Sequence, residues 1–301
     1  MNIIQISPEL YLISLDQELA GFKAFIGAWL YKGKKNILID PGPGSTIPLL
    51  INALKQLEVK HLDLVMLTHI HIDHAGGVGD LSLHFPDTPV VCHKAGVRHM
   101  ADPLRLWQGS LKILGEPARV YGEINPVNKD LLIDAAIFKD PDILIIPTPG
   151  HAVHHLSFVL DKYLFAGEAG GIFLNLSNSD FYLRPATPPR FFLETSIQSI
   201  DALLQTPHKH ICYGHFGVTD KTPVILEQHK DQLLTWADII KEQIKSCDPD
   251  NLTESCINVL VDHDPLMTGW HNFKDSILQR ERYFMKNSVQ GFIEYLSQED
   301  S

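Results

Sequence analysis

Histidine and aspartate side chains gather in one short stretch of the chain, residues 64–77, which reads LVMLTHIHIDHAGG. Its first four residues are an apolar run with the length of a buried strand. The polar residues that follow it closely are His69, His71, Asp73 and His74. Neutral imidazoles and carboxylates are common ligands of zinc, iron and manganese. The stretch therefore predicts a metal site, with a histidine-rich surface loop as the alternative.

The spacing of these side chains suggests how one loop addresses two metal ions. In an extended segment the side chains alternate with a period of two, so His69, His71 and Asp73 would point the same way. His74 would then point elsewhere. We therefore expect ligands for two neighbouring metals from this single stretch.

The H-x-H-x-D-H pattern resembles the signature of the metallo-β-lactamase superfamily of hydrolases, which draws further ligands from the ends of later strands. Three later segments fit the resemblance, because apolar runs precede Thr148-Pro149-Gly150-His151, Gly167-Glu168 and Gly214-His215. The departure is Glu168, since the superfamily usually has an aspartate at that place. The match covers residues 1–220 in the expected order.

The resemblance implies a centre of two divalent metal ions, with zinc expected first and iron or manganese left open. Three histidines would hold one metal: His69, His71 and His151. An aspartate and two histidines would hold the other: Asp73, His74 and His215. Two metals about 3.5 to 4 Å apart can share a hydroxide and stabilise the attacking and leaving oxygens. We expect hydrolysis of an activated acyl compound, such as a thioester, a lactone or a similar ester, with Asp73 relaying a proton.

Glu168 leaves three alternatives open, because its extra methylene group adds reach and flexibility. It could bridge both metals, bind one metal only, or turn away from the site. In the last case a single metal would remain at His69, His71 and His151. Such a mononuclear iron site would resemble the persulfide dioxygenases, which share the expected fold, and an iron oxidoreductase is therefore the alternative function.

Other residues are candidates for supporting roles. Tyr182 and Arg184 lie in the proline-rich segment 170–190, where a tyrosine could donate a hydrogen bond to an oxyanion and an arginine could hold a carboxylate or phosphate. By resemblance, Asp40 would contact a ligating histidine, and His155 would stand behind the site rather than bind metal. The remaining histidines, among them His154 and His99, are expected to be surface or packed residues.

The pattern of apolar runs predicts an α/β fold of two packed sheets with helices outside, which in the superfamily is the four-layer αββα sandwich. Expected strands cover residues 3–6, 10–14, 24–31, 36–40, 64–67, 89–92, 143–146, 156–160, 162–166 and 210–213. Expected helices cover residues 46–57, capped by Ser45, 78–84, 95–114, with a break at Asp102-Pro103, and 191–204. Residues 120–132 are expected to form edge strands and turns.

The chain changes character after His215. Residues 221–245, 250–261 and 273–296 are charged and have helical periodicity, with almost no strand pattern. We therefore predict a metallo-β-lactamase-like domain at residues 1–220 and a helical C-terminal extension at residues 221–301. Glyoxalase II enzymes also end in helices, but no residues of their glutathione site can be matched here. Packing or a homodimer contact is the expected role of the extension.

Composition and the absence of other motifs narrow the expected partner, location and reaction class. The 301 residues carry a net charge of −11 and no run of lysine or arginine, so nucleic acid is not the expected partner and a small-molecule substrate is. No apolar run reaches the ~18 residues of a membrane span. Four cysteines without C-x-x-C spacing indicate reduced thiols and a cytoplasmic protein. A G-x-S-x-G serine-hydrolase motif is absent.

Overall fold

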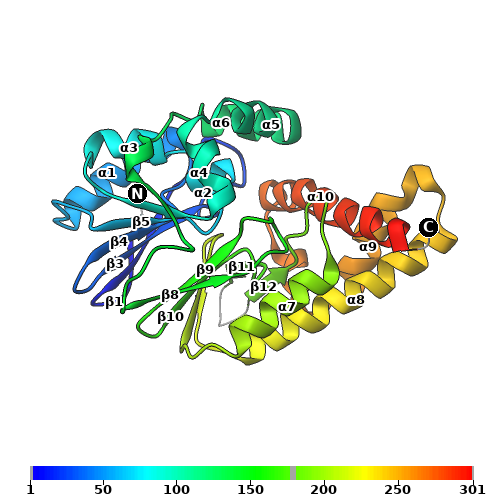
Figure 1. Ribbon diagram of the computed structural model, residues 1–301. Coiled ribbons are helices and arrows are strands. Elements are labelled where there is room, and N and C mark those ends of the chain that lie inside the picture. Colours follow the sequence, from blue (N-terminus) through cyan, green and yellow to red (C-terminus); the bar gives the residue numbers. More distant parts are fainter. Residues whose placement is uncertain (1–2, 177–180, 300–301) are drawn as a thin grey trace.

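Two β-sheets packed face to face form the centre of the computed structural model, which describes residues 3–176 and 181–299 (Figure 1). The first sheet has seven strands in chain order: β1 (Ile3–Ser7), β2 (Leu10–Ser14), β3 (Gly27–Lys32), β4 (Asn36–Ile39), β5 (Leu64–Met66), β6 (Val90–Cys92) and β7 (Leu132–Asp134). Strands β1 to β4 pair antiparallel, and β4 to β7 pair parallel. Parallel neighbours need long crossovers, which the helices of this half provide.

The second sheet has the strand order β14-β13-β10-β9-β8. Its strands are β8 (Ile143–Pro147), β9 (Leu156–Leu160), β10 (Tyr163–Gly167), β13 (His210–Tyr213) and β14 (Val218–Thr219). A tight turn at Asp161 joins β9 to β10, and its positive φ of 53° is one that aspartate tolerates better than most residues. The helix α7 (Leu193–Leu204) lies in the crossover from this hairpin to β13, which pairs parallel to β10.

Apolar side chains from both sheets fill the space between them. Leu12, Trp29 and Met66 of the first sheet belong to one buried cluster with Phe158 and Phe165 of the second sheet. The Trp29 indole also donates a hydrogen bond of 2.9 Å to the backbone oxygen of the β13 residue Tyr213, which ties the sheets together. Alternation along each strand places these side chains on one face, and burying them favours the packed arrangement.

Helices cover the outer faces of the two sheets, which confirms the predicted αββα layers (Figure 1). On the first half lie α1 (Ile47–Gln56), α2 (Ile72–Ala75), α3 (Val78–His84), α4 (Lys94–Ala101), α5 (Leu104–Leu114) and α6 (Glu116–Tyr121). The buried positions of α1, Ile47, Leu50, Ile51 and Leu54, have the spacing of one helix face. No residue of α5 is buried, although apolar residues make up more than half of that helix.

Three long helices follow the second sheet: α8 (Val224–Ser246), α9 (Leu252–His263) and α10 (Asp275–Glu299), with a 3-10 segment at Pro265–Asn272. Their buried residues, such as Trp236, Leu260 and Phe292, belong to the same hydrophobic cluster as Leu54 of α1 and Leu67. The division of the chain at residue 220 stays a prediction. Within the described ranges, no helix combines the length and apolar character needed to cross a bilayer.

Three local expectations were wrong. Edge strands and turns were expected at residues 120–132, but residues 120–121 end the helix α6, which has Pro117 in its first turn and Tyr121 buried at its end, and a strand begins only at Leu132. The proline-rich segment 170–190, where no strand was expected, contains a hairpin, β11 (Ile172–Asn175) and β12 (Phe181–Arg184); residues 177–180 lie outside the described part. The helix α1 begins at Ile47 after a 3-10 turn, and the Ser45 hydroxyl contacts Gln17 instead of capping it.

A buried charge cluster attaches α10 to the β12 strand. The Arg184 Nε donates to Glu281 Oε2 at 2.6 Å, and the Arg280 Nε donates to Glu281 Oε1 at 2.9 Å. All three side chains are at most 3% exposed. Burial raises the pKa of Glu281, but the two guanidinium groups outweigh it and leave that pKa below its usual value. Glu281 therefore balances one of two buried positive charges.

We expect Glu281→Gln to lower the free energy of unfolding by about 3 to 5 kcal/mol, because it leaves two buried guanidinium groups without a counter-charge. Urea denaturation would measure this change. Glu254→Gln is the matched control, since Glu254 pairs with Arg282 and Lys286 at the surface and is 46% exposed. The control should cost less than about 1 kcal/mol. Equal losses in both variants would contradict the role given to the buried cluster.

Candidate metal centre

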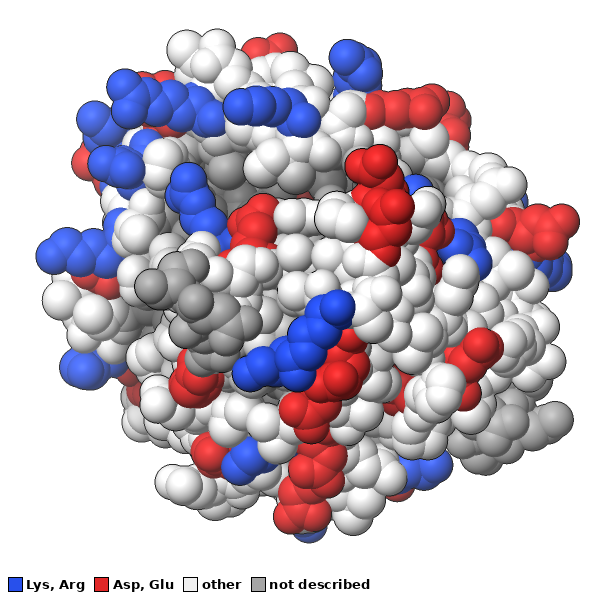
Figure 2. Space-filling view, turned by 90° about the vertical axis from the view of Figure 1, so that its right-hand side faces the viewer, with Lys and Arg blue, Asp and Glu red and all other residues white. Residues whose placement is uncertain are grey.

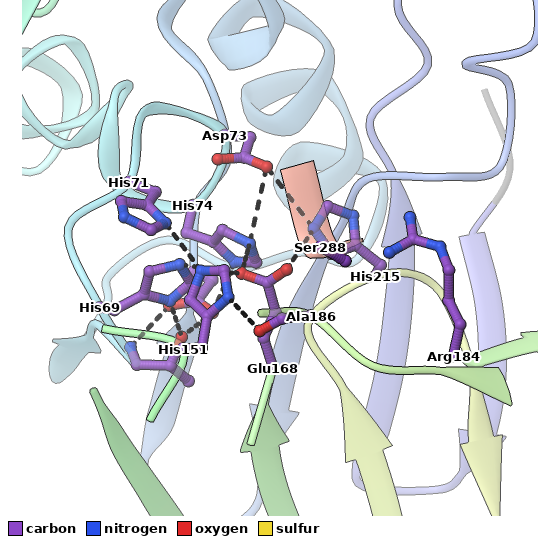
Figure 3. Close-up of polar contacts among 12 residues, drawn as sticks. His69, His71, Asp73, His74, His151, Glu168, Arg184, Ala186, His215 and Ser288 are labelled. Atoms are coloured by element: carbon purple, nitrogen blue, oxygen red, sulfur yellow. Dashed lines mark hydrogen bonds and ion pairs between the residues drawn. The ribbon is translucent and has the colours of Figure 1, made fainter. Parts of the chain in front are cut away.

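Each residue predicted to bind metal lies in the loop or short helix after a strand, at the edge where both sheets end (Figure 3). The loop and α2 after β5 carry the four residues of the signature stretch. His151 follows β8, Glu168 follows β10 and His215 follows β13. The carboxyl ends of strands thus bring together residues that are far apart in the sequence.

The sequence pattern suggested that the signature stretch is extended, but part of the stretch is helical. Residues Ile72–Ala75 form the short helix α2, so Asp73 does not continue the alternation of His69 and His71. The candidate ligands form two groups. Within each group, the donor atoms lie within 4.8 Å of one another. The first group is His69, His71, His151 and Glu168, and the second is Asp73, His74 and His215. The predicted division of the histidines is therefore present, with a different local geometry.

The first group has its donor atoms close together. His151 Nε2 lies 2.9 Å from His71 Nδ1, and Glu168 Oε2 lies 2.7 Å from His151 Nε2 and 3.1 Å from His69 Nε2. Burial and neighbouring imidazoles lower the pKa of His69 and His71 well below the usual value, which favours the neutral form that binds metals.

The Glu168 carboxylate lies between the two groups. Its Oε2 faces the first group and lies 3.7 Å from His74 Nε2, and its Oε1 lies 3.3 Å from His215 Nε2. In the second group, Asp73 Oδ2 lies 3.5 Å from His215 Nε2 and 3.8 Å from His74 Nε2. Of the three alternatives for Glu168, this position favours a bridge, because a carboxylate turned away would meet neither group.

A glycine permits the sharp turn that aims Glu168 into the site. Gly167 has a φ of +54°, and a Cβ at this position would lie 2.4 Å from the Nε2 of His155. The same His155 Nε2 accepts the backbone N–H of Glu168 at 3.0 Å, while its Nδ1 lies 2.9 Å from the Thr148 hydroxyl. His155 is thus held behind the site and positions the backbone of Glu168.

The buried Asp40 orients two of the histidines. His74 Nδ1 donates to Asp40 Oδ2 at 3.1 Å, and the Thr68 hydroxyl donates to the same oxygen at 2.6 Å. The Thr68 oxygen in turn lies 3.0 Å from His69 Nδ1. Burial lowers the pKa of His74, but the Asp73 and Asp40 carboxylates outweigh it and raise that pKa to about 9. A carboxylate at Nδ1 fixes the tautomer that leaves Nε2 for a metal.

The donor set fits a pair of divalent cations. The Nε2 atoms of His69 and His74 are buried and make no hydrogen bond with any part of the chain that the structure describes. Buried polar atoms normally have a partner, so atoms of this kind inside a ring of imidazoles and carboxylates indicate an ion. His151 is oriented in the same way as His74, because its Nδ1 donates to the Ala186 oxygen at 3.0 Å.

The two residues of the β12 strand lie away from the donor atoms. Tyr182 is fully buried and its hydroxyl does not reach the cavity beside the metal centre, so its predicted role as an oxyanion donor has no support from this position. Arg184 does line that cavity, on the far side of His215 from the first group (Figure 3). Its Nε is occupied by Glu281.

A cavity of about 510 Å³ adjoins the metal centre. Its walls come from α5, from α10 and from the segment after β12. His154 and His99, which the sequence suggested were surface or packed residues, line this cavity, as does Tyr121. Only their position in the fold identifies His99 and Tyr121, whereas His154 lies three residues after His151 of the T-P-G-H motif.

Comparison with known proteins gives a consistent result. The family model described as "Metallo-beta-lactamase superfamily" matches residues 26–215. The Metallo-beta-lactamase fold-containing protein ST1585 of Sulfurisphaera tokodaii is 30% identical over 188 residues, which are 59% of this chain and 69% of that protein. A Hydroxyacylglutathione hydrolase of Yersinia pestis is 28% identical over 188 residues, and the match spans 62% of this chain and 60% of that enzyme.

Solved structures show the same fold. The crystal structure of ST1585 superposes with a TM-score of 0.70 at 22% identity and covers 96% of this chain and 99% of that one. The metallo-beta-lactamase family protein TTHA1429 of Thermus thermophilus gives a TM-score of 0.67 at 19% identity, with 98% of this chain and 95% of that chain covered. Both alignments include the C-terminal helices, because they extend over nearly the whole chain.

We expect Asp40→Asn to weaken zinc binding about 10- to 100-fold, because the amide cannot accept from both Thr68 and His74 as the carboxylate does. Competition with a coloured chelator would measure the affinity. Asp264→Asn is the matched control, since Asp264 is also buried but accepts hydrogen bonds from Gln232 and Trp236 among the C-terminal helices. Unchanged zinc affinity in Asp40→Asn would contradict the orienting role.

Proposed function

The chain belongs to the metallo-beta-lactamase superfamily, and on that premise we propose that it is a binuclear metal-dependent hydrolase of activated acyl compounds. The observation that carries the proposal is the Glu168 carboxylate between two groups of buried ligands. When bound, two divalent cations would lower the pKa of a water towards about 7 and stabilise the charge that develops on the substrate oxygens.

The chain's own residues supply orientation and proton transfer. Asp40 and the Ala186 oxygen hold His74 and His151 at Nδ1, so that Nε2 of each would be available to hold a cation. Asp73 is the candidate proton carrier, because its side chain is 14% exposed and lines the cavity. A positioned carboxylate can accept a proton from the attacking water and pass it on to the leaving group.

An acyl substrate agrees with the surroundings of the site. Apolar residues dominate the cavity walls beyond the metal ligands, among them Phe25, Ile113 and Phe284. Pockets of 300–1,000 Å³ with apolar walls and a few polar groups are typical small-molecule sites. The similarity to a protein named Hydroxyacylglutathione hydrolase supports a thioester, and lactones and similar esters have the same activated carbonyl.

The alternative, a mononuclear iron oxidoreductase, would use only His69, His71 and His151. The second group, Asp73, His74 and His215, would then hold no metal ion, although two of its members are buried. This second group supports two metals over one. A cytoplasmic location, a small-molecule substrate and a homodimer stay predictions.

Elemental analysis of the purified protein should find close to two metal ions per chain, and Glu168→Ala should lower that number, because the variant removes the carboxylate shared by both groups. Glu227→Ala, at an exposed position of α8, is the control and should keep the full count. One iron per chain, unchanged in Glu168→Ala, would contradict the binuclear proposal and lead to oxygen consumption assays with persulfides.

Asp73→Asn should lower kcat for acyl hydrolysis about 10²- to 10⁴-fold, because it removes the proton carrier. The assay is thioester and lactone hydrolysis by zinc-loaded protein, and metal analysis of the same sample separates proton transfer from loss of a ligand. The phosphodiester bis(4-nitrophenyl) phosphate serves as the comparison substrate. Faster turnover of the phosphodiester than of every acyl compound would overturn the acyl assignment.

A further inference from the structure

Apart from the candidate metal ligands, the charged side chains that line the cavity beside the metal centre are all positive. Its acidic lining residues are Asp73 and Glu168, which both belong to the metal groups. Every other charged side chain that lines it is an arginine: Arg105, Arg184 and Arg190. In a chain of net charge −11, this concentration of positive charge is a property of the cavity and not of the whole protein.

Two of these arginines have no counter-charge. Arg105 lies at the start of α5 and Arg190 in the segment between β12 and α7; both are exposed, and neither makes an ion pair within residues 3–176 and 181–299. Figure 2 shows Lys and Arg side chains gathered beside a hollow at the upper left of one face. Guanidinium groups bind carboxylate, sulfonate and phosphate oxygens through paired N–H donors.

The third arginine adds buried charge to the same wall. Arg184 shares the single carboxylate of Glu281 with Arg280, so this cluster keeps an excess of one positive charge. Its guanidinium is 3% exposed and already bound to Glu281, so its contribution is to the electrostatic field and not a direct contact. A positive field in a cavity with apolar walls attracts anions more strongly than the same charges in open solvent.

Apolar side chains occupy the rest of the cavity wall. Leu106, Ile113 and Leu114 of α5 contribute to one side and Phe284 of α10 to another. Ile113 is 69% exposed and Leu106 and Leu114 are half-buried, so this part of the wall is apolar surface in contact with water. An apolar segment of a ligand would remove this surface from water.

We propose that the substrate is an anionic amphiphile: an activated acyl compound whose carboxylate, sulfonate or phosphate binds Arg105 and Arg190, with an apolar segment between that anion and the scissile carbonyl. This inference rests on the proposed hydrolase function. The metal centre holds the carbonyl, α5 and α10 contact the apolar segment, and the arginines hold the charged end. Neutral esters of the same length are therefore not expected to be preferred substrates.

The test uses matched thioesters on the zinc-loaded, full-length protein. In the first pair, the octanoyl thioester of mercaptoethanesulfonate carries an anion on the leaving group, and the octanoyl thioester of N-acetylcysteamine lacks it. In the second pair, the suberoyl thioester of N-acetylcysteamine carries an anion on the acyl chain, and the octanoyl thioester lacks it. Each rate is divided by the uncatalysed rate. We expect kcat/KM to be at least about tenfold higher for the anionic member of one pair, which also identifies the end that bears the anion.

The double variant Arg105→Gln/Arg190→Gln should abolish that preference. The loss should appear as a KM raised about tenfold for the anionic substrate with kcat nearly unchanged, because the arginines lie away from the reacting atoms. Kinetics on the neutral substrate should stay within about twofold of the original. Arg119→Gln is the matched control, since Arg119 is an exposed arginine of the neighbouring α6 that does not line the cavity.

Two results would overturn the proposal and leave the hydrolase assignment intact: equal kcat/KM for both members of each pair, or a preference that survives in the double variant. If neither these thioesters nor lactones and similar esters are hydrolysed, the hydrolase assignment itself fails, and calorimetry with octanesulfonate decides the anion site. Binding that the double variant weakens about tenfold, but Arg119→Gln does not, supports the site. Equal binding by all three proteins, or binding by none, overturns it.

Discussion

The structure depends on keeping a group of imidazoles and carboxylates inside the protein at one edge of two sheets. Seven such side chains converge there, and four of them, His69, His74, Glu168 and His215, are less than 8% exposed. Burial of polar and charged groups is costly unless each has a partner. The surrounding chain supplies part of that compensation through Asp40, Thr68 and His155, and the remaining Nε2 atoms are placed where they could bind cations. The geometry of the strand ends follows from this requirement.

The supporting residues are as specific as the ligands. Asp40 connects the first sheet to both ligand groups, because its carboxylate reaches His74 directly and His69 through Thr68. His155 does the same for the second sheet by accepting the Glu168 N–H. Each half of the sandwich therefore contributes its own buried hydrogen-bond network, and the metal centre is where the two networks meet. Glu168 in place of the shorter aspartate keeps contact with both halves.

The C-terminal helices complete the cavity and do not merely cover the fold. The α10 helix contributes Phe284 and Ser288 to the cavity wall and Glu281 to the charge cluster with Arg184. The hairpin β11–β12 is held from the other side by the Leu183 oxygen, which accepts a hydrogen bond from Gln232 of α8. The cavity is thus formed by packing between the superfamily core and helices that lie outside the residues matched by the family model.

The sequence by itself determined the candidate ligands, because their spacing is local and each follows an apolar strand: His69 and His71 after β5, and His151, Glu168 and His215 after later strands. It also indicated the two sheets and the C-terminal helices from hydrophobic periodicity. It did not reveal the helical turn at Asp73, since four residues are too few for a periodic pattern. It missed the β11–β12 hairpin, whose second strand, β12, packs against α8 and the 3-10 segment.

Only the tertiary structure decided where the chain's charges act. Arg105, Arg190 and His154 are far apart in sequence and belong to no motif, and they become neighbours of one cavity through the packing of α5, α10 and the β12 segment. Arg184 and Tyr182 seemed equivalent candidates in one loop, and residues two apart on a strand share a face. Both meet Glu281 of α10, because burial and the Glu281 carboxylate raise the pKa of Tyr182 and the same carboxylate accepts from Arg184; what separates them is that Tyr182 packs against Phe273 whereas Arg184 lines the cavity. Such contacts come from the packing of distant segments, which no local pattern encodes.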